Sequence, residues 1–115
     1  MAVPRNYTVE FARVAEGDVL AIVDYLAVHD PGAALRALHQ FEAAAASLEK
    51  FPNRGRIVPE LEVHGLVTHR ELVIAPWRMV YRMAGQAVYV VAVFDGRRNL
   101  EDVLLDRAVR ATDAG

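Results

Sequence analysis

Residues 66–94, LVTHRELVIAPWRMVYRMAGQAVYVVAVF, decide the fold. The apolar run breaks at 75–76 (AP) and again at 84–86 (AGQ), leaving three segments of strand length at 66–74, 77–83 and 87–94. Links as short as these predict an antiparallel meander. The third segment, AVYVVAVF, is apolar at successive positions, so we expect it to be buried on both faces and to be the central strand.

Two helices are predicted upstream of the meander. Residues 7–11, YTVEF, alternate apolar and polar side chains as a half-buried strand does. From residue 12 the apolar positions recur every three or four residues, which predicts a helix to about residue 28. Asp30 and Pro31 are typical of the N-cap and first position of a second helix, which ends near residue 51. Helices joined this closely form an antiparallel hairpin.

The remaining segments complete a single domain. Residues 53–61, NRGRIVPEL, are expected to form a loop, and residues 100–111 a helix capped by Asn99. The sequence therefore predicts one α+β domain spanning residues 1–115. Its elements are an N-terminal strand, an antiparallel helical hairpin, a three-stranded antiparallel meander and a short C-terminal helix, with all strands in one antiparallel sheet.

The composition excludes several kinds of site. The chain has no cysteine, which excludes a disulfide, a thiolate zinc site and a cysteine nucleophile. The four histidines lack the spacing of a ligand pair, and no glycine-rich phosphate loop or serine nucleophile motif is present, so we expect no metal and no cofactor. The apolar runs are too short to span a bilayer, and no signal peptide is recognisable, so we expect a cytoplasmic protein without a membrane partner. The roles of His64 and His69 stay open.

The charge balance argues against a protein whose main binding partner is nucleic-acid phosphate. The net charge is −2, because the chain has thirteen lysines and arginines and fifteen aspartates and glutamates. Residues 1–53 carry a charge of −3 and residues 54–115 a charge of +1, a mild asymmetry rather than a strongly basic patch. We therefore expect no direct sequence-specific binding of nucleic acid.

Arginines of the meander and of the turn after it are the candidate contact residues. Arg78 and Arg82 share a side-chain direction along their strand, which predicts a positive face on the sheet. The candidates for binding a target or partner are Arg70, Arg78, Arg82, Arg97 and Arg98. The alternative is that these arginines are solvated or paired with nearby acids, namely Glu60, Glu62, Glu71 and Asp95.

The order of these segments resembles the RelE/ParE superfamily of type II toxin–antitoxin toxins, and its ParE branch most closely. The resemblance covers residues 7–107 and depends on the order and spacing of several short motifs. These are YTVEF (7–11), SLEKFPNRGR (47–56), VPEL (58–61), HREL (69–72), WRMVYRM (77–83) and VFDGRRN (93–99). It implies a bacterial toxin domain of the kind associated with plasmid stabilisation.

The two branches of the superfamily imply different activities. RelE-type toxins cleave messenger RNA in the ribosome with arginines, lysines and, in many members, a C-terminal tyrosine. Here the matching arginine position falls near Val73, and residues 100–115 contain no Tyr, His or Lys. ParE-type toxins are described as inhibiting DNA gyrase without a catalytic constellation. The resemblance therefore implies a gyrase inhibitor with no catalytic residues, and the messenger ribonuclease is the alternative.

The family also implies a protein partner. Such toxins are neutralised by an antitoxin, here of the ParD type, whose C-terminal segment folds on the toxin as a helix. Apolar residues at the edges of the predicted hairpin are candidates for that contact, and the alternative is that they complete the toxin's own core. These residues are Leu20, Tyr25 and Leu35. A third reading is a non-toxic remnant that still binds an antitoxin.

Overall fold

The meander predicted from residues 66–94 is present in the computed structural model, which describes residues 6–114 and the side chains of residues 6–108. Strands β3 (His69–Ile74), β4 (Trp77–Ala84) and β5 (Ala87–Asp95) pair antiparallel in consecutive order. Met79 of β4 lies between Leu72 and Val93 and is fully buried, so one apolar row crosses all three strands. The antiparallel meander is therefore confirmed.

The sheet extends beyond the meander at both edges, and its strand order is β1-β5-β4-β3-β2. The short strand β2 (Arg56–Ile57) pairs antiparallel with β3, whereas β1 (Thr8–Phe11) pairs parallel with β5. The expectation of a wholly antiparallel sheet was wrong, because the chain passes through both hairpin helices and the meander before it returns beside β1, and no tight turn fixes the direction of that pair. β5 is an interior strand, but β4 is the central one.

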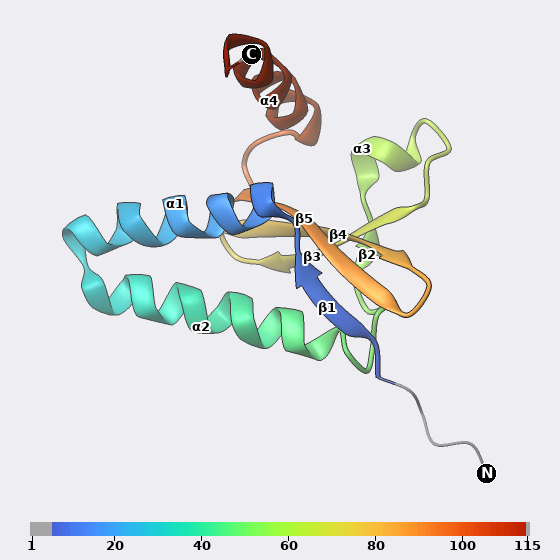
Figure 1. Ribbon diagram of the computed structural model, residues 1–115, viewed down its shortest axis with the longest axis horizontal. Helices are drawn as coiled ribbons and strands as arrows, with labels where there is room; N and C mark the ends of the chain where they lie inside the picture. The colour runs from blue at the N-terminus through green and yellow to red at the C-terminus, as the bar shows by residue number, and fades with distance from the viewer. Residues whose placement is uncertain (1–5, 115) are drawn as a thin grey trace.

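The helical hairpin covers one face of the sheet (Figure 1). Helix α1 (Arg13–His29) and helix α2 (Pro31–Ser47) meet at Asp30, whose carboxylate accepts a hydrogen bond of 3.1 Å from the Ala33 amide. The predicted N-cap is confirmed. Ala15 and Phe41 of the hairpin pack with Tyr81 and Val90 of the sheet, all buried, so this layer is the main core.

The opposite face of the sheet carries two further helices. Strand β2 lies within residues 53–61 and helix α3 (Pro59–Glu62) begins there, so the prediction of a loop for these residues was wrong. These elements are too short to show a periodicity. Helix α4 (Leu100–Ala114) is longer than predicted, and the Glu101 amide donates to Asn99 Oδ1 at 2.7 Å, as expected of the cap. A second apolar cluster lies beneath these helices and contains Val58, Val80, Ala92, Phe94, Leu100 and Val103.

Helix α4 projects away from the sheet (Figure 1). Leu104 and Leu105 are 51% and 65% exposed, whereas Leu100 and Val103 are buried. Among the described side chains of α4, Leu100 and Val103 therefore contribute to the core, and Leu104 and Leu105 do not. Within the described residues, no helix is long and apolar enough to cross a membrane.

Candidate functional site

Arg78 lies inside the protein and not on an exposed positive face. Its side chain is 8% exposed. It donates two hydrogen bonds to Glu71 Oε1, at 2.9 and 2.5 Å, and one to each carboxylate oxygen of Glu60, both at 2.7 Å. These bonds lower the pKa of Glu60 to about 2 and raise the pKa of Arg78. The expectation that Arg78 contacts a target was wrong, because its donors are consumed by buried acids.

The ion pairs of Arg78 belong to a larger ionic network, defined as Arg56, Glu60, Glu71 and Arg78, which runs from the buried Glu71 to Arg56, whose side chain is 59% exposed. Glu71 is 1% exposed and also accepts a hydrogen bond of 2.8 Å from Arg56 Nε. Glu60 Oε2 accepts a further bond of 2.8 Å from the Leu100 amide. The network therefore ties β2, β3, β4 and α3 to the first residue of α4. Pairing with Glu60 and Glu71, the alternative drawn from the sequence, is confirmed for Arg78.

Arg70 holds a loop. It points to the opposite face of β3 from Glu71, and its Nη1 donates to the Gly55 carbonyl at 2.8 Å. Tyr81 fixes the same loop, because its hydroxyl accepts from the Gly55 amide at 3.0 Å and donates to the Pro52 carbonyl at 2.7 Å. A Cβ at position 55 would lie 2.6 Å from the Glu71 carbonyl oxygen, so the approach requires glycine. Burial raises the pKa of Tyr81.

Arg82 is exposed at the far end of β4. Its guanidinium carbon lies 5.0 Å from the centre of the Tyr89 ring, a cation–π contact. It faces His69 across the strand pair, and partial burial together with the Arg82 charge lowers the pKa of His69. Among the described residues, no group of three or more His, Asp or Glu side chains is arranged to hold a metal ion.

Arg97 and Arg98 lie together at the surface, in the turn between β5 and α4. Asp95 forms that turn, because its carboxylate accepts from the Arg97 amide at 2.9 Å and its carbonyl accepts from the Arg98 amide at 2.9 Å. The Arg97 guanidinium folds back on Asp95 at 3.0 and 2.7 Å, which lowers the pKa of Asp95 to about 2 and raises that of Arg97. The Arg97 side chain is nevertheless 88% exposed.

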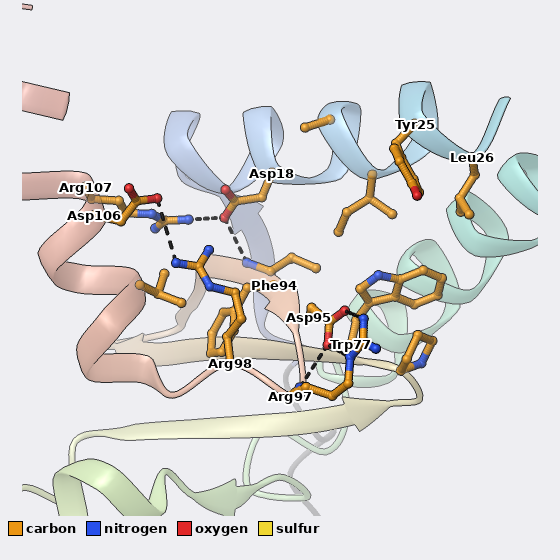
Figure 2. Close-up of a pocket in the computed structure, with 15 residues that line it drawn as sticks. Asp18, Tyr25, Leu26, Trp77, Phe94, Asp95, Arg97, Arg98, Asp106 and Arg107 are labelled. Atoms are coloured by element: carbon orange, nitrogen blue, oxygen red, sulfur yellow. Dashed lines mark hydrogen bonds and ion pairs between the residues drawn. The ribbon is translucent and has the colours of Figure 1, made fainter. Parts of the chain in front are cut away.

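The absence of a side chain at Gly96 lets this turn approach the β3–β4 connection. The Gly96 amide donates to the Pro76 carbonyl at 2.6 Å, and a Cβ at Gly96 would lie 2.9 Å from the same oxygen. The close contact brings Trp77 beside the two arginines (Figure 2).

A groove of about 450 Å³ lies where α1, this turn and α4 meet; we call it the α1–α4 groove. Its walls combine aromatic and apolar side chains with charged pairs (Figure 2). Tyr25, 72% exposed, and Trp77, half-buried, stand on the side of α1 and β4, and Arg97 and Arg98 stand on the side of the turn. Arg98 pairs with Asp106 of α4 at 3.8 Å.

The inner end of the groove is closed by an ion pair between Asp18 of α1 and Arg107 of α4. Both residues also bind the backbone of β5: Asp18 Oδ2 accepts from the Val93 amide at 2.9 Å, and Arg107 donates to the Val91 carbonyl at 3.3 Å. β1 pairs only with residues 87–90 of β5. Beyond the end of β1, the side chains of Asp18 and Arg107 therefore supply hydrogen-bond partners to the exposed backbone edge of β5.

The predicted apolar contact residues are exposed but do not form one surface. Tyr25 lines the α1–α4 groove, Leu20 lines a second groove between α1 and α2, and Leu35 lines neither. Leu20, Tyr25 and Leu35 are 62%, 72% and 54% exposed, so the alternative that they complete the core was wrong. The five predicted arginines are also dispersed, and Arg97 and Arg98 are the pair that the turn brings together at the surface.

Sequence reasoning missed Asp18, Trp77, Asp106 and Arg107 as residues of the groove. Asp18 lies on the hairpin and Arg107 on the last helix, 89 positions apart, so no local pattern relates them. Trp77 begins a strand and resembles an ordinary core residue in the sequence. A signal was present in α4, where Arg107 follows Val103 by four residues and so shares its inward face.

Two solved structures, both from toxin–antitoxin systems, share this fold. A chain of the chromosomal ParDE toxin–antitoxin system from P. aeruginosa superposes with a TM-score of 0.64 at 22% identity, over 77% of this chain and 95% of that one. A chain of the RelBE2 toxin–antitoxin complex from Mycobacterium tuberculosis superposes with a TM-score of 0.55 at 21% identity, over 83% and 97%. At these identities the likeness establishes the fold alone.

Sequence comparison identifies the family to which the chain belongs. Residues 9–100 match the model of the ParE toxin of type II toxin–antitoxin systems (parDE), and the chain belongs to that family. It is 35% identical to Toxin RelE2 of Caulobacter vibrioides over 80 residues, which is 69% of this chain and 83% of that protein. It is also 35% identical to Toxin ParE3 of the same species over 63 residues, 55% of this chain and 59% of that protein.

Proposed function

We propose that this chain is a toxin that inhibits DNA gyrase through protein–protein contact, has no chemistry of its own, and is neutralised by a ParD-like antitoxin. The observation that carries the proposal is the composition of the α1–α4 groove. Tyr, Trp and Arg are the residue types that dominate binding energy at protein interfaces, and Tyr25, Trp77, Arg97 and Arg98 line one groove.

The protonation chemistry of the groove favours binding over catalysis. A general base works best when its pKa is near the operating pH. Each aspartate that lines the groove pairs with an arginine, and the pKa of Asp95 is lowered to about 2, far from that range. The absence of Tyr, His and Lys from residues 100–115 points the same way.

A supercoiling assay with purified gyrase tests the target. The wild-type protein should inhibit supercoiling, and the double variant Arg97→Glu with Arg98→Glu should lose inhibition while keeping its fold by circular dichroism. Arg13→Glu with Lys50→Glu is the matched control, because it makes the same change in charge at two exposed positions outside the groove. Gyrase that stays fully active in excess wild-type toxin, while a reference toxin inhibits it, would exclude gyrase as the target.

The messenger ribonuclease is the second candidate, because the relative named RelE2 matches a larger share of the chain than ParE3 does. Expression in cells separates the two functions. Filamentation with a DNA-damage response supports gyrase as the target, whereas prompt translation arrest with cleaved transcripts supports the ribonuclease. A protein that binds its antitoxin but leaves growth unaffected when expressed alone would be the non-toxic remnant.

The antitoxin part of the proposal draws on the solved relatives, which come from toxin–antitoxin systems. The exposed apolar side chains of the hairpin support it, since Leu20, Tyr25 and Leu35 remain available to a partner. Co-purification with the protein encoded by the neighbouring gene is the direct test. A stable complex that also restores supercoiling would support neutralisation by direct binding, and the failure of the two proteins to associate would contradict it.

A further inference from the structure

A row of side chains crosses the sheet on the face that lies away from the hairpin. Arg82 of β4 lies opposite His69 of β3 and Tyr89 of β5, and Tyr89 lies opposite Glu10 of β1. Residues directly opposite one another on neighbouring strands point to the same face. Val88, which precedes Tyr89, packs beneath the hairpin, so the row points away from it. We call His69, Arg82, Tyr89 and Glu10 the sheet row.

The sheet row lies at the end of the sheet that α4 leaves uncovered. The β5 residues that pack with α4 are Ala92 and Phe94, and Tyr89 lies about 10–16 Å from them along the strand. Arg82 and Glu10 are both exposed. The next set of opposite residues, farther still from α4, has small side chains that let another surface approach closely. These residues are Ala84, Ala87 and Thr8.

The two charged residues of the sheet row are not paired with any acid or base that the structure describes. Within residues 6–108, whose side chains are described, neither Arg82 nor Glu10 forms an ion pair. The Arg82 guanidinium instead lies over the Tyr89 ring. Arg97 and Arg98 differ, because acids of the same chain pair with them. The sheet row therefore presents a cation and an anion on either side of an aromatic ring.

A second copy of the chain would supply both of the missing partners. A twofold axis parallel to β5 and passing over Tyr89 brings the sheet row of a second copy face to face with the first, in reverse order. Each Arg82 then lies opposite Glu10 of the other copy, and the two Tyr89 rings meet on the axis. The strands of the two sheets stay nearly aligned, as in most sheet packing, about 10 Å apart. Such an interface is isologous, so each favourable contact occurs twice.

We propose that the sheet row is the contact surface of a weak homodimer of this chain, in which Arg82 of each copy pairs with Glu10 of the other. A second copy fits better than a basic or an acidic partner, because either of those would satisfy one charge of the row and repel the other. One end of a sheet face is a small interface, and small interfaces give transient complexes.

The dimer is independent of the target proposed above. The α1–α4 groove is lined by Trp77 and Asp95, at the opposite end of β4 and β5 from the sheet row, so the dimer leaves that groove exposed. The loss of the dimer would leave the proposed inhibition of gyrase intact, and a failure to inhibit gyrase would leave the dimer intact.

Sedimentation equilibrium of the full chain over a range of concentrations tests the dimer. Wild type should show a reversible monomer–dimer equilibrium that weakens as the salt concentration rises. Arg82→Glu and Glu10→Arg should each weaken the dimer by about tenfold or more, because symmetry replaces two attractive pairs with two repulsive ones. The double variant Arg82→Glu with Glu10→Arg should restore it, since each charge again faces its opposite. Arg97→Glu is the matched control and should dimerise as wild type does.

Three results would overturn the proposal. A wild-type protein that stays monomeric at its highest soluble concentration would exclude the dimer. A dimer that neither single variant weakens would exclude the sheet row as its interface. A charge-swapped double variant that folds, as judged by circular dichroism, but does not regain the dimer would exclude the pairing of Arg82 with Glu10.

Cross-linking tests the twofold axis without changing the charged residues. Ala87 lies on β5 and on the same face as Tyr89, so it should lie close to the same residue of the second copy. The chain has no cysteine, and Ala87→Cys therefore supplies a single thiol. A bismaleimide that spans about 10 Å should join two copies of this variant but not two copies of Arg97→Cys. Equal cross-linking of the two variants would contradict the axis.

Discussion

Arg78 and Arg97 make similar ion pairs in opposite surroundings. Each binds a carboxylate through two guanidinium nitrogens, yet the Arg78 side chain is 8% exposed and that of Arg97 is 88% exposed. The partners of Arg78 come from α3 and β3, whereas Arg97 binds Asp95, two residues away. The presence of an ion pair therefore does not distinguish an arginine that stabilises the fold from one that is free to contact a partner. The position of the acid in the sequence does distinguish them, because acids from distant elements bury the charge of Arg78, whereas the neighbouring Asp95 leaves Arg97 in solvent.

The largest effect on stability should come from removing the buried cation. Arg78→Met leaves Glu71 and Glu60 without their main partner, and breaking a buried pair in this way costs about 3–5 kcal/mol. Urea unfolding followed by circular dichroism measures the loss. Arg97→Met is the matched control and should leave the unfolding midpoint unchanged. Equal unfolding midpoints for the two variants would show that Arg78 stabilises the fold no more than Arg97 does.

Glu60 should give the next largest effect, and one that depends on pH. Its pKa is about 2 in the folded protein and near 4.5 when unpaired, so as pH falls the unfolded chain takes up the proton first. Its contribution to stability is therefore complete above pH 4.5 and is lost between 4.5 and about 2. Glu60→Gln should destabilise the protein at pH 7 and reduce the slope of stability against pH in that window. An unchanged slope would contradict the role given to Glu60.

The pair that closes the α1–α4 groove should give a smaller and more local effect. Asp18→Asn removes the charge that binds Arg107 and weakens the bond from the Val93 amide, at a cost of about 1 kcal/mol for a partly exposed pair. Hydrogen exchange should accelerate at Val93 and in the first turns of α4, while exchange at Tyr81 stays slow. Asp24→Asn on the same helix is the control. Uniform acceleration across the sheet would indicate global rather than local opening.

The smallest effect on stability should accompany a large effect on function. Arg97→Ala removes an exposed side chain whose partner is also solvated, so the midpoint of thermal unfolding should not change measurably. Inhibition in the supercoiling assay should fall, because the groove loses a principal contact. Arg82→Ala, which removes an exposed arginine at the other end of β4, should retain inhibition. Equal inhibition by wild type and Arg97→Ala would show that Arg97 does not contact the target and is only part of the turn.

Arg78 and Arg97 also show how much of the site the sequence could predict. Alternation along residues 77–83 placed Arg78 and Arg82 on one face, and the structure keeps them there. Periodicity does not reveal what covers a face, and α3 covers one end of this face through Glu60, 18 positions from Arg78. Arg97 directly follows Asp95 and Gly96, residue types typical of a surface turn, so the sequence itself indicates that Arg97 is exposed.

The same reasoning accounts for the elements that were right and wrong. The hairpin was predicted because Asp30 and Pro31 mark a helix start within the sequence itself. Helix α3 has four residues and β2 has two, about one period of each pattern, and a single period is too short to reveal a periodicity. The direction of β1 beside β5 depends on a connection through most of the chain. Features set by neighbouring residues could therefore be predicted from the sequence, whereas the arrangement of elements distant in the sequence could not.

The attachment of α4 at two separate points gives the turn before it a second role. The Leu100 amide is held by Glu60, and Arg107 is held by Asp18, on opposite sides of the sheet edge. Each residue added to or removed from the turn would rotate a following helix by roughly 100°, since an α-helix has 3.6 residues per turn. One inserted residue would carry Arg107 away from Asp18 even with every side chain unchanged. The length of residues 96–99 thus sets the rotational phase of α4, a constraint on chain length and not on residue identity.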